Sequence, residues 1–198
     1  MGLSEMTQSD REETNMDHIS AFAGQDLEWL QPKAMEHYFE LQAGPAQLAT
    51  LTFHSAWGTL ASAETADGAW TFKRVGFLNP RVTVRVAGSP DNLAVYQPRF
   101  WGDGAVTFAD GTAFRWQPIN FWATEWAFTG PGDTPLIRFK SGAEKQRLSD
   151  MFKTQAVVEI ESDELIRPFL PLLVALGMYL IILHQQDAAG AVAATAAV

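Results

Sequence analysis

Cysteine is absent from this chain of 198 residues, and its absence excludes disulfide frameworks, thiolate metal sites and thiol nucleophiles together. Basic residues are also scarce, because 14 lysines and arginines stand against 23 acidic residues and the formal net charge is -9. Tight binding of duplex nucleic acid needs many cations that neutralise phosphates, so we expect no nucleic-acid partner. The sequence also contains no P-loop, GxGxxG, GxSxG or HExxH pattern. It therefore predicts no catalytic residue, no cofactor and a function other than catalysis.

Histidine is present but is not arranged as a ligand set. The four histidines lie at positions 18, 37, 54 and 184, and no two of them have the i,i+3 or i,i+4 spacing of a helical metal site. We therefore expect no metal. His184 follows a long apolar segment, which predicts a residue at the C-terminal end of a helix that interacts with the last carbonyl groups.

The negative charge is concentrated near the N-terminus, where residues 1–40 contain nine acidic and two basic residues. Residues 1–28 are polar and aperiodic, which predicts an acidic disordered tail, and the Ala-rich residues 187–198 predict a second tail. The N-terminus has neither the cationic nor the apolar region of a signal peptide. With the lack of cysteine, this predicts a cytoplasmic localisation.

The middle of the chain alternates between apolar and polar residues with a period of two, in short segments separated by Gly, Pro, Asn and Asp. This pattern is typical of an all-β sandwich or barrel. Arg81–Val86 is the clearest segment, because its three valines alternate with polar residues. A short charged stretch over residues 143–152 is the one internal helix candidate. Eleven strands are predicted: residues 37–42, 48–53, 59–64, 69–77, 81–86, 93–97, 105–108, 112–117, 121–128, 136–139 and 154–160.

A segment of sixteen uncharged residues, Pro168–Leu183, is apolar on every side of a helix. Such a helix lies either in a membrane or inside a protein. A helix from Pro168 to His184 would be about 25 Å long, shorter than the roughly 30 Å of a hydrocarbon core. No lysine or arginine follows it as an anchor. We therefore favour a helix inside a closed antiparallel barrel over a membrane span.

Four stretches of the chain point to a known family. WTFKR at residues 70–74, FRW at 114–116, ESDEL at 161–165 and ALGMYLIIL at 175–183 resemble the tubby-like C-terminal domain superfamily, which includes LURP-one-related proteins and phospholipid scramblases. The resemblance implies a mainly β domain over residues 29–186: a closed antiparallel barrel of about twelve strands around a central hydrophobic C-terminal helix. No lipid-site residue is carried over from the family.

One group of cations is a candidate binding patch. Two neighbouring predicted strands, joined by a turn at residues 78–80, carry Lys73, Arg74, Arg81 and Arg85, and the candidate patch consists of Lys73, Arg81 and Arg85. If these strands form a hairpin, Arg81 and Arg85 share a face and Lys73 lies near them, so that the three side chains could bind a phospholipid headgroup or another anion. The alternative is a solvated strand face without a ligand.

Two further features each have two interpretations. Glu159 and Glu161 share a strand face, which suits either a proton-sharing acid pair or a solvated strand end, and Glu125 is expected to face solvent or to pair with Arg115. Aromatic residues are dense over residues 100–128, where they form either a ligand surface or the barrel core. These aromatics are Phe100, Trp101, Phe108, Phe114, Trp116, Phe121, Trp122, Trp126 and Phe128.

The sequence thus predicts a non-enzymatic module that binds a lipid headgroup or a protein partner. The alternative function is a tail-anchored membrane protein with a cytoplasmic β-domain. A third hypothesis, a small-molecule enzyme built on a β-barrel, would require a polar cleft with a strongly perturbed acid or base.

Overall fold

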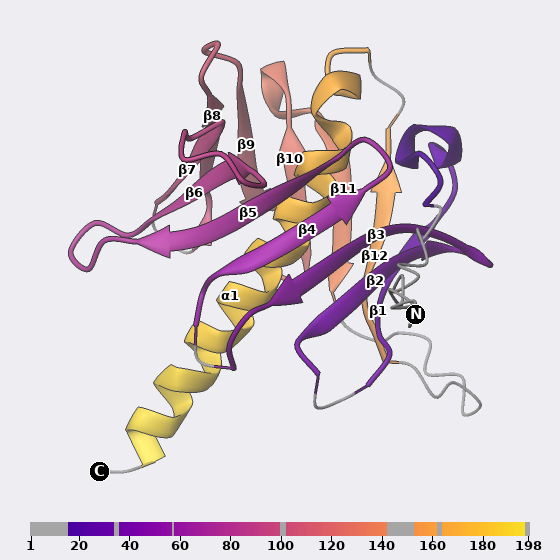
Figure 1. Ribbon diagram of the computed structural model, residues 1–198. Coiled ribbons are helices and arrows are strands. Elements are labelled where there is room, and N and C mark those ends of the chain that lie inside the picture. Colours follow the sequence, from indigo (N-terminus) through magenta and orange to yellow (C-terminus); the bar gives the residue numbers. More distant parts are fainter. Residues whose placement is uncertain are drawn as a thin grey trace, which may run out of the picture.

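The alternating segments form the strands of a closed antiparallel barrel in the computed structural model, which describes residues 16–33, 36–56, 58–99, 102–141, 153–161 and 164–196 (Figure 1). The strands are β1 (Leu27–Gln31), β2 (Tyr38–Ala43), β3 (Ala46–Phe53), β4 (Ala61–Thr65), β5 (Gly68–Val75), β6 (Arg81–Val86), β7 (Ala94–Pro98), β8 (Gly104–Phe108), β9 (Ala113–Pro118), β10 (Glu125–Thr129), β11 (Pro135–Ser141) and β12 (Lys153–Ile160). The helices are the 3-10 turns η1 (Ile19–Phe22), η3 (Pro131–Asp133) and η4 (Arg167–Phe169), and α1 (Leu170–Ala196). The predicted fold class is confirmed.

Every strand pairs with its neighbours in the chain, and β1 closes the barrel by pairing with β12 from Leu27 opposite Val158 to Gln31 opposite Lys153. Closure removes the unpaired edges that an open sheet would present. Because the strands alternate in direction, the connections that follow odd-numbered strands all lie at one end of the barrel. Helix α1 enters the barrel at the opposite end and leaves it at the end that carries these connections (Figure 1). We call the latter the helix-exit end.

Helix α1 fills the barrel and supplies much of its core. Every residue from Leu170 to Leu183 is buried, which explains why this segment has no polar face. The inward side chains of the strands surround it, and Trp29, Phe72 and Phe139 are among the largest that are fully buried. The barrel wall thus provides the apolar environment that the helix needs, and the helix fills the space that the strands enclose.

The ends of the domain differ from the prediction. Ile19 in η1 is fully buried and β1 begins at Leu27, so the predicted tail of residues 1–28 includes part of the folded core. At the other end, α1 continues to Ala196 and does not stop at His184, because alanine is the strongest helix former. The predicted Ala-rich tail is therefore helical through residue 196.

Two strand predictions need correction. Strand β1 was not predicted. The segment 121–128 is a strand only from Glu125, because Phe121 and Trp122 lie in a turn and are exposed. In β6 the register places the three valines on one face, opposite Trp70, Phe72 and Arg74, although Val86 is 46% exposed at the end of the strand. The helix predicted over residues 143–152 lies outside the described residues.

Candidate ligand site at the helix-exit end

A cavity of about 250 Å³ opens at the helix-exit end, between α1 and the ends of β5, β6, β7, β9 and β10. Its apolar lining comes from the rings of Tyr96, Trp116 and Trp126 on the wall and from Leu180 and Leu183 on the helix. The two tryptophan rings are stacked with their centroids 5.4 Å apart. The cavity therefore presents a preformed aromatic and aliphatic surface to solvent.

Cations dominate the polar lining of this cavity. Arg74, Arg81 and Arg99 line it from the end of β5, the start of β6 and the connection after β7. Asp187 is the one carboxylate among the described residues that line it. Guanidinium groups bind phosphate and carboxylate in a bidentate geometry. Cations above an apolar wall suit a ligand that has both an anionic group and an apolar portion.

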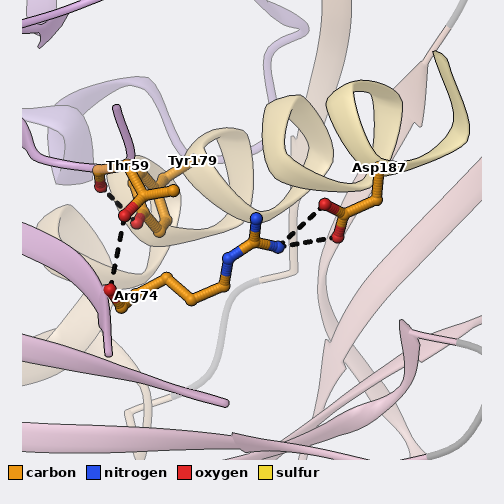
Figure 2. Close-up of polar contacts among 4 residues, drawn as sticks. All are labelled: Thr59, Arg74, Tyr179 and Asp187. Atoms are coloured by element: carbon orange, nitrogen blue, oxygen red, sulfur yellow. Dashed lines mark hydrogen bonds and ion pairs between the residues drawn. The ribbon is translucent and has the colours of Figure 1, made fainter. Parts of the chain in front are cut away.

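The acid Asp187 already engages one of the cations. Arg74 Nη1 donates to both carboxylate oxygens of Asp187, at 2.9 and 2.7 Å, and this ion pair joins β5 to the part of α1 that has left the barrel (Figure 2). The Arg74 side chain is 33% exposed and that of Asp187 56% exposed, so solvent screens the pair. The contact holds the guanidinium at the cavity and is weak enough for an incoming anion to compete with it.

Two tyrosines fix the walls around the cavity. The Tyr179 hydroxyl donates to the carbonyl of Thr59 at 2.6 Å, and the Thr59 hydroxyl donates to the carbonyl of Arg74 at 3.3 Å (Figure 2). The Tyr96 hydroxyl donates to the carbonyl of Gly102 at 2.9 Å. Burial raises the pKa of both phenols, so both remain neutral donors. Each hydroxyl thus ties a connection at the helix-exit end to the barrel core.

His184 was predicted to end its helix, and this is wrong, because α1 continues for three further turns to Ala196. Its imidazole packs edge-on against Trp126, with ring centroids 5.2 Å apart, and lines the cavity. Gly102 makes this contact possible, because a Cβ there would lie 3.2 Å from both His184 and Trp126. The histidine is a lining residue of the site.

The predicted patch residues lie on the outer face of the β5–β6 hairpin. Lys73 is opposite Thr83, which places it between Arg81 and Arg85 on the same face. Arg85 Nε donates to Asn92 Oδ1 at 2.9 Å, and Arg85 does not line the cavity. Of the three patch residues, only Arg81 also lines the cavity. The sequence placed Arg74 in the same basic set but not in the patch, and it did not single out Arg99; the position of both at the cavity depends on where α1 leaves the barrel.

Most of the other candidate residues form ion pairs on the barrel surface or are buried in the core. Glu159 pairs with Lys140, and Glu161 lies 3.9 Å from Arg138, so each carboxylate of the suggested acid pair has its own cation. Arg115 pairs with Asp133 at 2.5 Å and not with Glu125. Most of the dense aromatics are core residues: Phe108, Phe114, Trp116, Trp126 and Phe128 are buried, whereas Phe121 and Trp122 are exposed, and Phe100 and Trp101 lie outside the described residues.

Across the described ranges, no three histidine or acidic side chains come together as metal ligands would. No protein-family model, curated protein or solved structure matches this chain.

Proposed function

We propose that this protein is a non-enzymatic lipid-binding module of the tubby-like and scramblase-like kind, and that the cavity at the helix-exit end binds a phospholipid headgroup. One observation carries the proposal: three arginines, from β5, β6 and the β7–β8 connection, meet over a wall of stacked aromatic rings. The arginines provide donors for a phosphate, and the aromatic and leucine side chains contact the glycerol and the first acyl carbons.

The size of the cavity supports a headgroup rather than a whole lipid. Its volume of about 250 Å³ is below the roughly 300–1,000 Å³ that is typical of pockets for drug-sized ligands. The acyl chains would therefore extend beyond it.

Short-chain phospholipids, used below the concentration at which they form micelles, test the proposal without a membrane. We expect isothermal titration calorimetry to show binding of dihexanoyl phosphatidic acid or phosphatidylserine and much weaker binding of dihexanoyl phosphatidylcholine. Each hydrogen bond to a charged group contributes about 1.5–3 kcal/mol, so Arg81→Ala/Arg99→Ala should lower the affinity by about tenfold or more. Arg115→Ala is the control, because this arginine is likewise exposed at the surface but does not line the cavity. Equal affinities of the two variants would contradict the proposal.

The second candidate function, a tail-anchored protein, is favoured by the length and apolarity of the C-terminal helix. Residues Arg167–Gly190 could cross a membrane by length and composition, and 78% of their most apolar stretch is buried within the barrel. Leaving the barrel would expose the inward faces of the strands to water, at about 25 cal/mol per Å² of apolar surface. We propose that the helix stays inside. Carbonate extraction tests this, because a barrel protein is released from membranes and an anchored one is retained.

A further inference from the structure

Two hairpin tips of the barrel are apolar and fully open to solvent. Phe77 is 96% and Leu78 93% exposed in the β5–β6 connection, and Phe121 is 91% and Trp122 79% exposed in the β9–β10 connection. Scattered single apolar residues are normal on a surface, but paired large ones at the tips of two turns are not. These tips have no role in the barrel core or in the lining of the cavity.

The turns themselves hold these side chains outward. In the β9–β10 connection Asn120 accepts from the Thr124 N–H at 3.0 Å and donates to the Thr124 hydroxyl at 2.8 Å, which closes the turn below the two aromatic residues. Phe121 and Trp122 pack edge to face at 5.2 Å. In the β5–β6 connection Gln97 on β7 donates to the side chain of Asn79 at 2.9 Å. Polar contacts thus fix both tips while their apolar residues remain uncovered.

Both tips lie at the helix-exit end, because both connections follow odd-numbered strands. Figure 1 shows the β5–β6 hairpin reaching out on the side from which α1 leaves the barrel. The cavity opens between the two hairpins, since its lining comes from β5 and β6 on one side and from β9 and β10 on the other. The tips therefore flank the mouth of the ligand site.

Exposed cations accompany the apolar tips. Arg81 and Arg99 are exposed at the mouth of the cavity, and Lys73 is exposed on the outer face of β5 near the same end. Aromatic and leucine side chains suit the boundary between lipid headgroups and acyl chains, and nearby cations are attracted to anionic lipids. This pairing of apolar tips with cations fits a membrane surface better than a neutral protein partner.

We infer that the helix-exit end is a membrane-docking face, in which Phe77–Leu78 and Phe121–Trp122 insert into the interface of an anionic bilayer. Insertion of the two tips brings the mouth of the cavity to the level of the lipid phosphates. The site then takes its headgroup directly from the bilayer. The inference deepens the proposed function and rests on it for the class of ligand, while the docking itself rests on the tips.

Vesicle sedimentation of the full chain tests this inference. Phosphatidylcholine vesicles with and without phosphatidylserine are mixed with the wild type, with Phe77→Asp/Leu78→Asp and with Phe121→Asp/Trp122→Asp. We expect binding to the anionic vesicles, reduced by about tenfold or more in each tip variant because a charge must enter the apolar interface. Val86→Asp is the matched control, since Val86 is 46% exposed at the opposite end, and it should bind as the wild type does.

Fluorescence gives a direct readout of insertion. The emission of Trp122 should shift to shorter wavelength on anionic vesicles and become protected from acrylamide, and Trp122→Phe should lose that change. The inference is overturned if the tip variants bind vesicles as the wild type does, or if Trp122 stays quenchable. It is also overturned if the wild type does not bind vesicles and light scattering shows that it self-associates through the tips.

The two proposals fail in different ways. Tip variants that still bind short-chain phosphatidic acid but not vesicles support both. If the tip variants keep vesicle binding while Arg81→Ala/Arg99→Ala loses the short-chain lipid, the docking face is wrong and the headgroup site stands. If vesicle binding depends on the tips but no short-chain lipid binds, the docking face stands and the headgroup site is wrong.

Discussion

Gly177→Ala is the sharpest test of where the C-terminal helix lies. A Cβ at residue 177 would overlap the aromatic ring of Phe139, which is fully buried and cannot move aside. The rings of Trp116 and Phe128 pack against Phe139 at 5.3 and 6.2 Å and hold it in place. The glycine thus allows the helix and β11 to approach each other closely, and any side chain there would overpack the core.

The expected magnitude follows from two opposing terms. Overpacking a rigid core costs about 1–3 kcal/mol, and an overlap with an immobile ring belongs at the upper end of that range. Replacing glycine by alanine within a helix regains about 1 kcal/mol. We therefore expect Gly177→Ala to lower the free energy of unfolding by about 2 kcal/mol. For a chain of this size, the corresponding fall in Tm is about 4–8 °C.

Gly190 is the matched control, because it lies in the same helix but has no atom within 4 Å of the Cβ that alanine would add. Gly190→Ala should therefore raise the stability by up to about 1 kcal/mol. Urea denaturation followed by tryptophan fluorescence measures both variants. Adding Phe139→Leu to Gly177→Ala should relieve the overlap, so that the double variant is more stable than the sum of the single effects. If Gly177→Ala is as stable as the wild type, the helix does not pack against Phe139 and the barrel core is wrong.

Three further predictions concern the polar groups around the site. Tyr179→Phe removes a buried hydrogen bond and should cost about 0.5–1.5 kcal/mol in urea denaturation. Asp187→Asn frees Arg74, so calorimetry should show tighter binding of phosphatidic acid with a stability change below about 1 kcal/mol. Burial, with help from a neighbouring glutamate, raises the pKa of Tyr38 to about 12, and burial raises the pKa values of Tyr96 and Tyr179 as well. Because the folded state keeps these phenols neutral, their contribution to the free energy of unfolding should be fully present below pH ~10. It should fall above pH ~10, where the tyrosines of the unfolded chain ionise. Ultraviolet absorbance of the folded protein should show phenolate only well above pH ~10.

Local periodicity was enough to predict most of the strands. In β6 the run RVTVRV buries Val82 and Val84 between charged residues, and such alternation marks a strand whatever its partner. Strand β1 was missed because LEWLQ is short and follows an acidic polar stretch, and only its pairing with β12 makes it part of the barrel. Pairing between strands more than a hundred residues apart leaves no periodic signal in the sequence.

The candidate site was less predictable than the fold. The alternation placed Lys73, Arg81 and Arg85 on one face, as the register of β5 and β6 requires. The cavity depends instead on the exit of α1, which brings Asp187 to Arg74 across 113 positions of the sequence. The sequence predicts a strand at Phe121–Trp122 because aromatic residues favour strands. The structure has a turn there instead, which the hydrogen bond from the Thr124 N–H to Asn120 closes.

The order of elements along the chain has a consequence for biosynthesis. All twelve strands precede α1, so a ribosome completes the barrel wall before it makes the helix that fills it. Until the helix emerges, the inward faces of the strands have nothing to pack against, and β1 must wait for β12 to pair. Barrel closure and core packing are therefore held back until β12 and α1 are made, and the apolar faces of the earlier hairpins stay uncovered until then. We expect a chain with this topology to need protection from aggregation while it is still attached to the ribosome.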